Sequence, residues 1–202
     1  MINIAILNYN SGNLASVKNA LQALNISADI VCDADLIAKY DKIILPGVGA
    51  FENAMNHLRE NHMDEAINLF AKSGKHIFGI CLGMQLLFDK SYEFGEHLGL
   101  GLISGEVVKF GDSMLKIPHI GWNTIEIKQN KGLLNGIKNN EYFYFVHSFY
   151  VKAAHKENIL AMCNYGENFC AIVQKDNIFG IQPHPEKSSN AGLKILDNFI
   201  NL

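Results

Sequence analysis

Arginine is almost absent from the sequence: of the seventeen Lys and Arg residues, only Arg59 is an arginine. Twenty Asp and Glu residues outnumber these cations and give a formal net charge of −3. Nucleic-acid binding normally needs a basic face, and phosphate recognition favours the guanidinium fork of Arg. The composition therefore argues against a nucleic-acid partner.

Cysteine is also scarce. The four cysteines are too few for a disulfide scaffold in a chain of 202 residues, and none has the Cys-x-x-Cys spacing of a zinc site. No apolar run approaches the roughly 18 residues of a membrane span, and the N-terminal residues MINIAILNYNSG lack the basic region of a signal peptide. We therefore expect a cytoplasmic protein with no membrane segment and no metal site.

What the chain does contain is typical of a folded globular protein. Hydrophobic residues make up 49% of it and charged residues 18%, with a mean hydropathy of +0.06. No internal repeat, low-complexity tract or Pro/Ser-rich linker interrupts it. The length and this continuity predict one domain over residues 1–202.

In the first half, short apolar runs alternate with amphipathic stretches. The pattern predicts strands at 2–7, 28–32, 42–45 and 76–81, and helices at 13–24, 50–59, 63–72 and 82–88. Asn10 or Ser11 is the expected cap of the first helix. Because the strands show no polar alternation, they indicate a parallel sheet that is covered on both faces.

From about Gly99 onward, short β-like runs follow one another, among them YFYFVHSFYV at 142–151. They predict antiparallel or mixed strands added to the first sheet, before a last helix at about 190–200. Cys163 and Cys170 flank an expected hairpin loop, so we expect their thiols to face each other. The fold class predicted is α/β.

The strongest local signal is Gly79-Ile80-Cys81-Leu82-Gly83, where a buried strand ends and a helix begins. Small neighbours permit the tight, strained turn that lifts a nucleophile out of a sheet. The helix N-terminus favours the thiolate and directs main-chain amides at a developing oxyanion. Taken alone, this spacing leaves open that Cys81 is only a small buried hydrophobic residue.

A second motif, Gln182-Pro183-His184-Pro185-Glu186, favours the catalytic interpretation of Cys81. A residue before Pro is pushed out of the α region, so His184 should be extended, and residues two apart in an extended chain face the same side. Glu186 would then hold one imidazole nitrogen while the other exchanges a proton with a thiol. Cys81, His184 and Glu186 are the predicted catalytic triad.

Several motifs together resemble the class I (triad) glutamine amidotransferases. They are PGVGAF at 46–51, GICLGMQLLF at 79–88 and GIQPHPEKS at 180–188. IPHIGWN at 117–123 and YFVHSFYV at 144–151 resemble, within that family, the glutaminase subunits that supply ammonia for imidazole glycerol phosphate formation in histidine biosynthesis. Pro183 departs from the family, which usually has an aromatic residue there.

The resemblance implies a flavodoxin-like three-layer α/β fold and hydrolysis of glutamine to glutamate and ammonia without a metal or organic cofactor. Cys81 would attack the amide, His184 would protonate the leaving ammonia, and water would cleave the thioester. The main-chain amide of Leu82 and that of Val48 or Gly49 would form the oxyanion hole. The residues that would bind glutamine are Gly49, Gln85, Glu93, His147 and Ser148.

Two of these assignments also have a physical basis. Gln85 lies one helical turn after Cys81 and so on the same face. Glu93 offers the negative charge that an α-ammonium needs, although a solvated acidic loop residue is the alternative. His147 lies in an aromatic strand and is equally well explained as a hydrogen-bonded core residue.

By resemblance, the IPHIGWN loop lies near a face that docks on a (β/α)8-barrel synthase subunit, together with Tyr144 and Lys187. Trp122 would be an interface anchor there, unless it is buried in the core. Three other functions stay open: the same glutaminase chemistry feeding a surface-sugar amidotransferase, a free-standing cysteine hydrolase, and a non-catalytic binding subunit.

Overall fold

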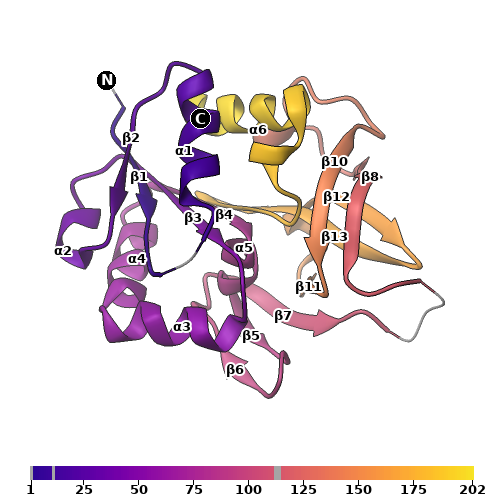
Figure 1. The fold of residues 1–202 in the computed structure, drawn as a ribbon, viewed down its shortest axis with the longest axis horizontal. Helices are drawn as coiled ribbons and strands as arrows, with labels where there is room; N and C mark the ends of the chain where they lie inside the picture. Colours follow the sequence, from indigo (N-terminus) through magenta and orange to yellow (C-terminus); the bar gives the residue numbers. More distant parts are fainter. Residues whose placement is uncertain (1, 11, 112–114) are drawn as a thin grey trace.

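The computed structural model describes residues 2–10, 12–111 and 115–202. A long central sheet crosses the molecule, with helices on both of its faces (Figure 1). Its first five strands are parallel and the last three are antiparallel. In spatial order the strands are β2 (Ala28–Val31), β1 (Ile4–Leu7), β3 (Lys42–Gly47), β4 (His76–Cys81), β14 (Ile178–Ile181), β13 (Glu167–Lys175), β12 (Ile159–Tyr165) and β9 (Glu126–Ile127).

Helices bury both faces of the parallel strands, which explains the strands' continuous apolar sequences. In β1, Ile4 and Ile6 pack into the cluster that contains the apolar faces of α1 (Leu14–Ala23) and α6 (Ser189–Asn201). Ala5 and Leu7 point into the opposite cluster, with residues of the helices on the other side. Those helices are α2 (Ala34–Ile37), α3 (Phe51–Glu60) and α4 (Met63–Lys72).

The second half of the chain adds two smaller sheets. One pairs β8 (His119–Thr124) with β10 (Tyr142–His147). The other has the order β11 (Phe149–Ala153), β7 (Ile103–Lys109), β5 (Phe88–Ser91) and β6 (His97–Leu98). Three short 3-10 helices complete the described elements: η1 (Gly132–Leu134), η2 (Lys156–Asn158) and η3 (Pro185–Lys187). The predicted α/β fold, with a mostly parallel sheet extended by antiparallel strands, is confirmed.

Some local predictions were wrong. The apolar run 142–151 is not one strand, because it turns at Ser148 and its two halves join different sheets. The helix predicted at 82–88 is shorter: α5 spans Leu82–Leu86, and Phe88 begins a strand that pairs with β7. The first helix has Asn13, not Asn10, at its N-cap. Ser11, the other proposed cap, lies outside the described residues.

The two hairpin cysteines do not face each other. In the β12–β13 ladder Cys163 is opposite Phe169 and Cys170 is opposite Met162. The two thiols lie in clusters on opposite sides of the sheet. The hairpin was predicted correctly, but a thiol pair also requires the right register and the same face.

The topology brings three separate segments to one edge of the sheet. β3, β4 and β14 are parallel neighbours, so their carboxyl ends meet, and ligands of open α/β sheets bind at such an edge. The segments that leave these strands are 47–50, 81–86 and 182–188. In the described part of the chain, no helix is both long and apolar enough to cross a membrane.

Candidate active site

Cys81 occupies a strained turn between β4 and α5. Its backbone has φ 56° and ψ −112°, a combination that L-residues rarely adopt. The two flanking glycines make the turn possible: a Cβ on Gly83 would lie 1.7 Å from the carbonyl oxygen of Leu45, and one on Gly79 would lie 2.6 Å from that of Gly83. The nucleophile elbow expected from the spacing is therefore present.

His184 and Glu186 form a buried pair beside this turn. The imidazole Nδ1 lies 2.7 Å from Glu186 Oε1, and both side chains are almost wholly buried. His184 is extended, as predicted, but Glu186 lies in the 3-10 turn η3. The contact between His184 and Glu186 was thus predicted correctly. The extended conformation from which it was predicted is wrong, because Pro185 starts a turn instead of continuing an extended chain.

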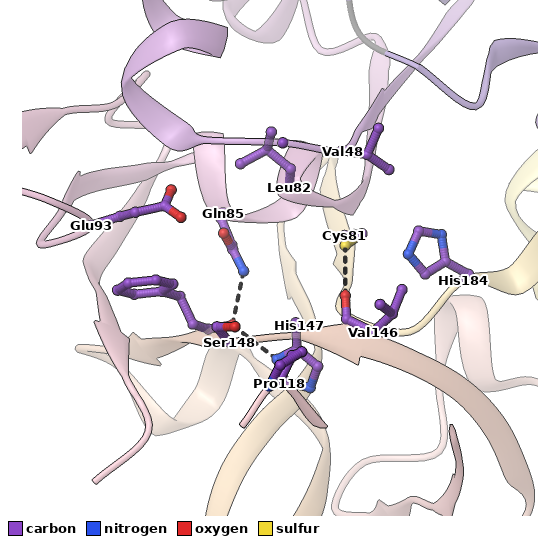
Figure 2. A pocket seen from close by; sticks show the side chains of 12 residues that line it. Val48, Cys81, Leu82, Gln85, Glu93, Pro118, Val146, His147, Ser148 and His184 are labelled. Atoms are coloured by element: carbon purple, nitrogen blue, oxygen red, sulfur yellow. Dashed lines mark hydrogen bonds between the residues drawn. The ribbon is translucent and has the colours of Figure 1, made fainter. Parts of the chain in front are cut away.

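The second imidazole nitrogen, Nε2, is buried and has no hydrogen-bond partner among the described residues. Figure 2 shows the imidazole beside the sulfur of Cys81. Burial alone would lower the pKa of His184, but the neighbouring Cys81 and Glu186 raise it to about 10. The surroundings thus favour an imidazolium between two groups that can carry negative charge.

The predicted site residues line one cavity of about 280 Å³. Figure 2 shows Glu93 and Cys81 in its wall, with Gln85 between them. The lining consists of Val48, Gly49, Cys81, Leu82, Gln85, Glu93, Pro118, Val146, His147, Ser148, Phe149 and His184. The structure therefore brings together every residue predicted for the oxyanion hole and for glutamine binding, and two of the three triad residues. Glu186 lies behind His184, outside the lining.

Glu93 connects this cavity to the start of α3. Its Oε2 accepts a hydrogen bond of 2.6 Å from the main-chain N–H of Phe51, the first residue of the helix. Carboxylates are favourable at helix N-termini because the N–H groups there lack partners within the helix. Glu93 is therefore not a solvated loop residue but a pocket residue that fixes the helix after the 46–49 turn.

A network of hydrogen bonds holds the opposite wall. The carbonyl oxygen of Phe149 accepts hydrogen bonds from Gln85 Nε2 at 3.0 Å and from His147 Nδ1 at 2.9 Å. The second nitrogen of His147 lies 3.0 Å from His119 Nδ1. Both ring nitrogens of His147 thus have partners within the protein, so its imidazole is a hydrogen-bonded core group.

His119 belongs to the same core network. Its ring is buried, and it stacks on Tyr165 and Phe145 with centroid distances of 4.0 and 4.9 Å. Burial lowers the pKa of His119 to about 4 and that of His147 to about 3. Both histidines are therefore neutral near pH 7, and His119 takes no part in the surface of its loop.

The three residues predicted for a docking face are neighbours in space. Trp122 is 52% exposed, so the alternative that it is a core residue does not hold. It lies opposite Tyr144 in the β8–β10 ladder, with ring centroids 6.0 Å apart. The ammonium group of Lys187 lies 6.0 Å from the Tyr144 ring. These three residues form a continuous strip beside the triad.

Two polar residues next to the triad were missed by the sequence reasoning. The side-chain amide of Asn13 donates to Glu186 Oε1 at 2.5 Å, so this N-cap residue does not cap its own helix. Gln182 is fully buried and donates to Cys81 Sγ at 3.7 Å. The signal for Gln182 was its place in the QPHPE motif, whereas nothing in the spacing connects Asn13 with a residue 173 positions away.

The other cysteines have different surroundings. Cys32 is exposed, whereas burial raises the pKa values of Cys163 and Cys170 to about 12. All four cysteines are free thiols. Among the described residues, no three His, Cys, Asp or Glu side chains gather in a way that could hold a metal ion.

The family model of the class I glutamine amidotransferases matches residues 5–202. The chain therefore belongs to this family.

Its relatives include one particular enzyme subunit. The chain is 50% identical over 203 residues to the imidazole glycerol phosphate synthase subunit HisH of Wolinella succinogenes, covering 98% of this chain and 99% of that protein. It is 53% identical over 200 residues to the protein of that name from Sulfurimonas denitrificans, covering 97% and 96%.

Solved structures agree on the fold. The structure of PurLQS from Thermotoga maritima covers 100% of this chain and 99% of its own, with a TM-score of 0.79 and 21% identity. A crystal structure of a glutamine amidotransferase covers 98% and 97%, with a TM-score of 0.77 and 18% identity. At these identities the likeness shows the glutamine amidotransferase fold alone.

Proposed function

We propose that this chain is the glutaminase subunit of an imidazole glycerol phosphate synthase. It hydrolyses L-glutamine to glutamate and ammonia. The ammonia passes to a HisF-like (β/α)8-barrel subunit that makes imidazole glycerol phosphate and AICAR in histidine biosynthesis. The observation that carries the proposal is the strained Cys81 elbow beside the buried His184–Glu186 pair, with Cys81 and His184 lining one pocket. Two HisH relatives of 50% and 53% identity support the pathway.

In the proposed reaction, the Cys81 thiolate attacks the side-chain amide carbon of glutamine. The oxyanion that forms is stabilised by main-chain N–H groups of Leu82 and of Val48 or Gly49, which line the same cavity. When the C–N bond breaks, His184 gives its proton to the leaving nitrogen and ammonia is released. His184 then takes a proton from water, which cleaves the thioester and releases glutamate.

We assign the amino-acid part of glutamine to the end of the cavity that holds Glu93. Its carboxylate is the charged group of the lining that suits the α-ammonium. Gly49, Gln85, and the main chain at His147 and Ser148 complete this binding region. Because Phe149 O and Gln182 Oε1 both hold Gln85 Nε2, its amide oxygen is the atom left for substrate.

We place the docking face for the barrel subunit on the strip of Trp122, Tyr144 and Lys187. Exposed Ile120 and Tyr142 extend its apolar surface on the same side of the β8–β10 ladder. The strip is linked to the triad, because the main-chain N–H of His184 donates to Tyr144 O at 2.9 Å. A partner that moves Tyr144 would therefore act directly on the His184 segment.

The rest of the proposal is that residues 1–202 act as one glutaminase domain in the reducing cytoplasm, where free thiols persist. The same glutaminase chemistry feeding a surface-sugar amidotransferase is the second candidate, because site geometry is independent of the acceptor. A free-standing cysteine hydrolase is less well supported, because the docking strip would have no use.

Labelling with a glutamine-analogue electrophile, diazo-oxo-norleucine, tests the proposal. The chain is incubated with the reagent in the presence of the barrel subunit, and the modified peptide is mapped by mass. We expect one covalent adduct, on Cys81, because the elbow gives this thiol an activating position that the other three lack. Labelling of Cys32, Cys163 or Cys170 with Cys81 untouched would overturn the assignment.

A further inference from the structure

Gln182 is a fully buried polar side chain beside the triad for which the mechanism above has no role. Buried amide groups are normally hydrogen-bonded, since an unpaired one carries a large desolvation penalty. Both the oxygen and the nitrogen of the Gln182 amide have hydrogen-bond partners. Its Oε1 accepts from Gln85 Nε2 at 3.0 Å, and its Nε2 donates to Cys81 Sγ at 3.7 Å.

The orientation of this amide follows from its neighbours. A main-chain carbonyl can only accept a hydrogen bond, so the group of Gln85 that faces Phe149 O must be its NH2 group. That same NH2 group faces Gln182, which must therefore present its oxygen to Gln85. The NH2 group of Gln182 is left facing the sulfur. Phe149 thus fixes the direction of the whole chain of hydrogen bonds.

From this geometry, and on the basis of the glutaminase function proposed above, we infer that Gln182 is a further catalytic residue. Its N–H stabilises the Cys81 sulfur whenever the sulfur carries negative charge. This occurs twice in the reaction: before attack on the amide carbon, and when the C–S bond of the thioester breaks and its electron pair returns to the sulfur. A hydrogen bond to an anion is about twice as strong as one between neutral groups.

Gln182 and His184 stabilise the sulfur in different ways. His184 both attracts the thiolate and exchanges its proton, so its contribution changes during each half-reaction. Gln182 has no titratable proton, and its N–H is available throughout. The side chain is held in place by Gln85, which belongs to the proposed glutamine-binding region. The chain of amides therefore joins that region to the nucleophile without passing through His184.

The test is the pH profile of Cys81 alkylation by iodoacetamide, measured in a Cys32→Ser background because Cys32 is exposed. Gln182→Met removes the amide at similar volume, and Gln182→Glu keeps an oxygen for Gln85 but turns a second oxygen toward the sulfur. We expect the midpoint of the profile to rise by about one pH unit in Gln182→Met, a tenfold change in the thiolate fraction, and further in Gln182→Glu. Glutamine-dependent kcat should fall about tenfold or more, with a smaller change in KM.

Asn198→Leu is the matched control. It removes a buried amide of α6 that donates hydrogen bonds to the main-chain carbonyls of Leu133 and Asn135, away from the sulfur. Its alkylation midpoint should match the parent even if its stability falls. The titratable groups that share the pocket with Cys81 are Glu93, His147 and His184, and all variants retain them.

The outcomes separate the two proposals. A folded Gln182→Met or Gln182→Glu protein with the parent's midpoint and kcat would show that Gln182 only fills space, and would overturn this inference while leaving the glutaminase function intact. A parent protein in which Cys81 is not alkylated, with no glutamine-dependent turnover in the presence of the barrel subunit, would overturn the proposed function itself.

Discussion

Cys81 combines an unfavourable backbone conformation with a position that packing fixes completely. A non-glycine residue in this region typically costs about 1–3 kcal/mol. The neighbouring strand supplies the constraint, because Gly47 of β3 pairs with Cys81 and Gly83 contacts the Leu45 carbonyl. The sulfur is therefore held at the cavity by the sheet, and not by a flexible loop.

His119 and His147, the neutral histidines behind the cavity, are held in one directed chain of hydrogen bonds. Since Phe149 O can only accept, His147 donates from Nδ1, and its Nε2 must accept from His119 Nδ1. His119 Nε2 in turn lies 3.3 Å from the amide of Asn123. This directed chain requires both rings to be uncharged, so protonation of either would break it.

The histidine pair predicts a pH dependence of stability. The folded-state pKa values, about 4 and about 3, lie below the ordinary value of 6.5, so the unfolded chain binds more protons as the pH falls. Stability should decrease from about pH 6.5 toward pH 4, by up to about 1.4 kcal/mol per pH unit for each ring. Urea unfolding at several pH values measures this slope.

His119→Gln is the control for that slope. Glutamine can also donate to His147 and accept from Asn123, but it does not titrate. The variant should lose stacking energy at every pH and show a smaller slope between pH 6.5 and 4. An unchanged slope would mean that other groups cause the acid sensitivity.

At the scale of elements, the turn between β3 and α3 places Val48, which lines the cavity, between Gly47 and Gly49. Gly47 and Gly49 have different reasons to be glycine. A Cβ on Gly47 would lie 2.5 Å from the Tyr9 hydroxyl and 2.9 Å from Gly83 N, so close packing excludes a side chain there. Gly49 faces open space but has φ +106°, so its conformation is the constraint.

Gly49→Ala therefore tests whether this turn supplies an oxyanion donor. Alanine disfavours the observed φ, so the main-chain N–H groups of Val48 and Gly49 should be displaced. We expect the glutaminase rate in the presence of the barrel subunit to fall about 10²-fold or more, the effect of losing one oxyanion donor. Steady-state glutamate formation measures it.

Gly74→Ala is matched to that variant, because Gly74 also has positive φ and open space, in the turn between α4 and β4. It should lower stability by a similar amount without changing the stimulated rate. If Gly49→Ala retained the full stimulated rate, the donor would have to come from elsewhere in the site.

The elements also show which features are predictable from sequence. The four parallel strands of the first half, α3 and α4 were placed correctly, because strands buried on both faces and helices buried on one leave clear apolar patterns. The fifth parallel strand, β14, was expected only as part of the antiparallel or mixed second half. The elbow was found because its two glycines are required locally. The corner at Ser148 was missed, because an unbroken aromatic run does not reveal which of two sheets each half joins.

Contacts in the site could be predicted where the two residues are close in sequence or belong to one motif. The contact between His184 and Glu186 was expected from a spacing of two residues. The contacts of Asn13 with Glu186 and of Gln182 with Cys81 depend on which strand ends meet in the sheet. Such long-range neighbours follow from topology, which periodicity alone does not give.

At the scale of the whole molecule, the proposed complex separates the production of ammonia from its use. The proposed triad lies where β4 and β14 end. Trp122 and Tyr144 lie on β8 and β10, which Figure 1 shows side by side, and Lys187 lies in η3. A partner bound to this strip would cover the side of the molecule next to the cavity. In the proposed complex the two chemistries are on different chains and are connected only by ammonia.

The separation of glutamine hydrolysis from the synthase reaction is tested most directly by comparing two nitrogen sources in the same assembled complex. Cys81→Ala and His184→Ala proteins are combined with the HisF-like subunit, and imidazole glycerol phosphate formation is followed with glutamine or with ammonium. We predict that glutamine-dependent turnover falls by at least about 10³-fold in both variants, with a smaller loss in Glu186→Ala, while ammonium-dependent turnover stays at the wild-type rate. Loss of the ammonium-dependent reaction in intact complexes, or wild-type turnover with glutamine in the Cys81→Ala complex, would contradict it.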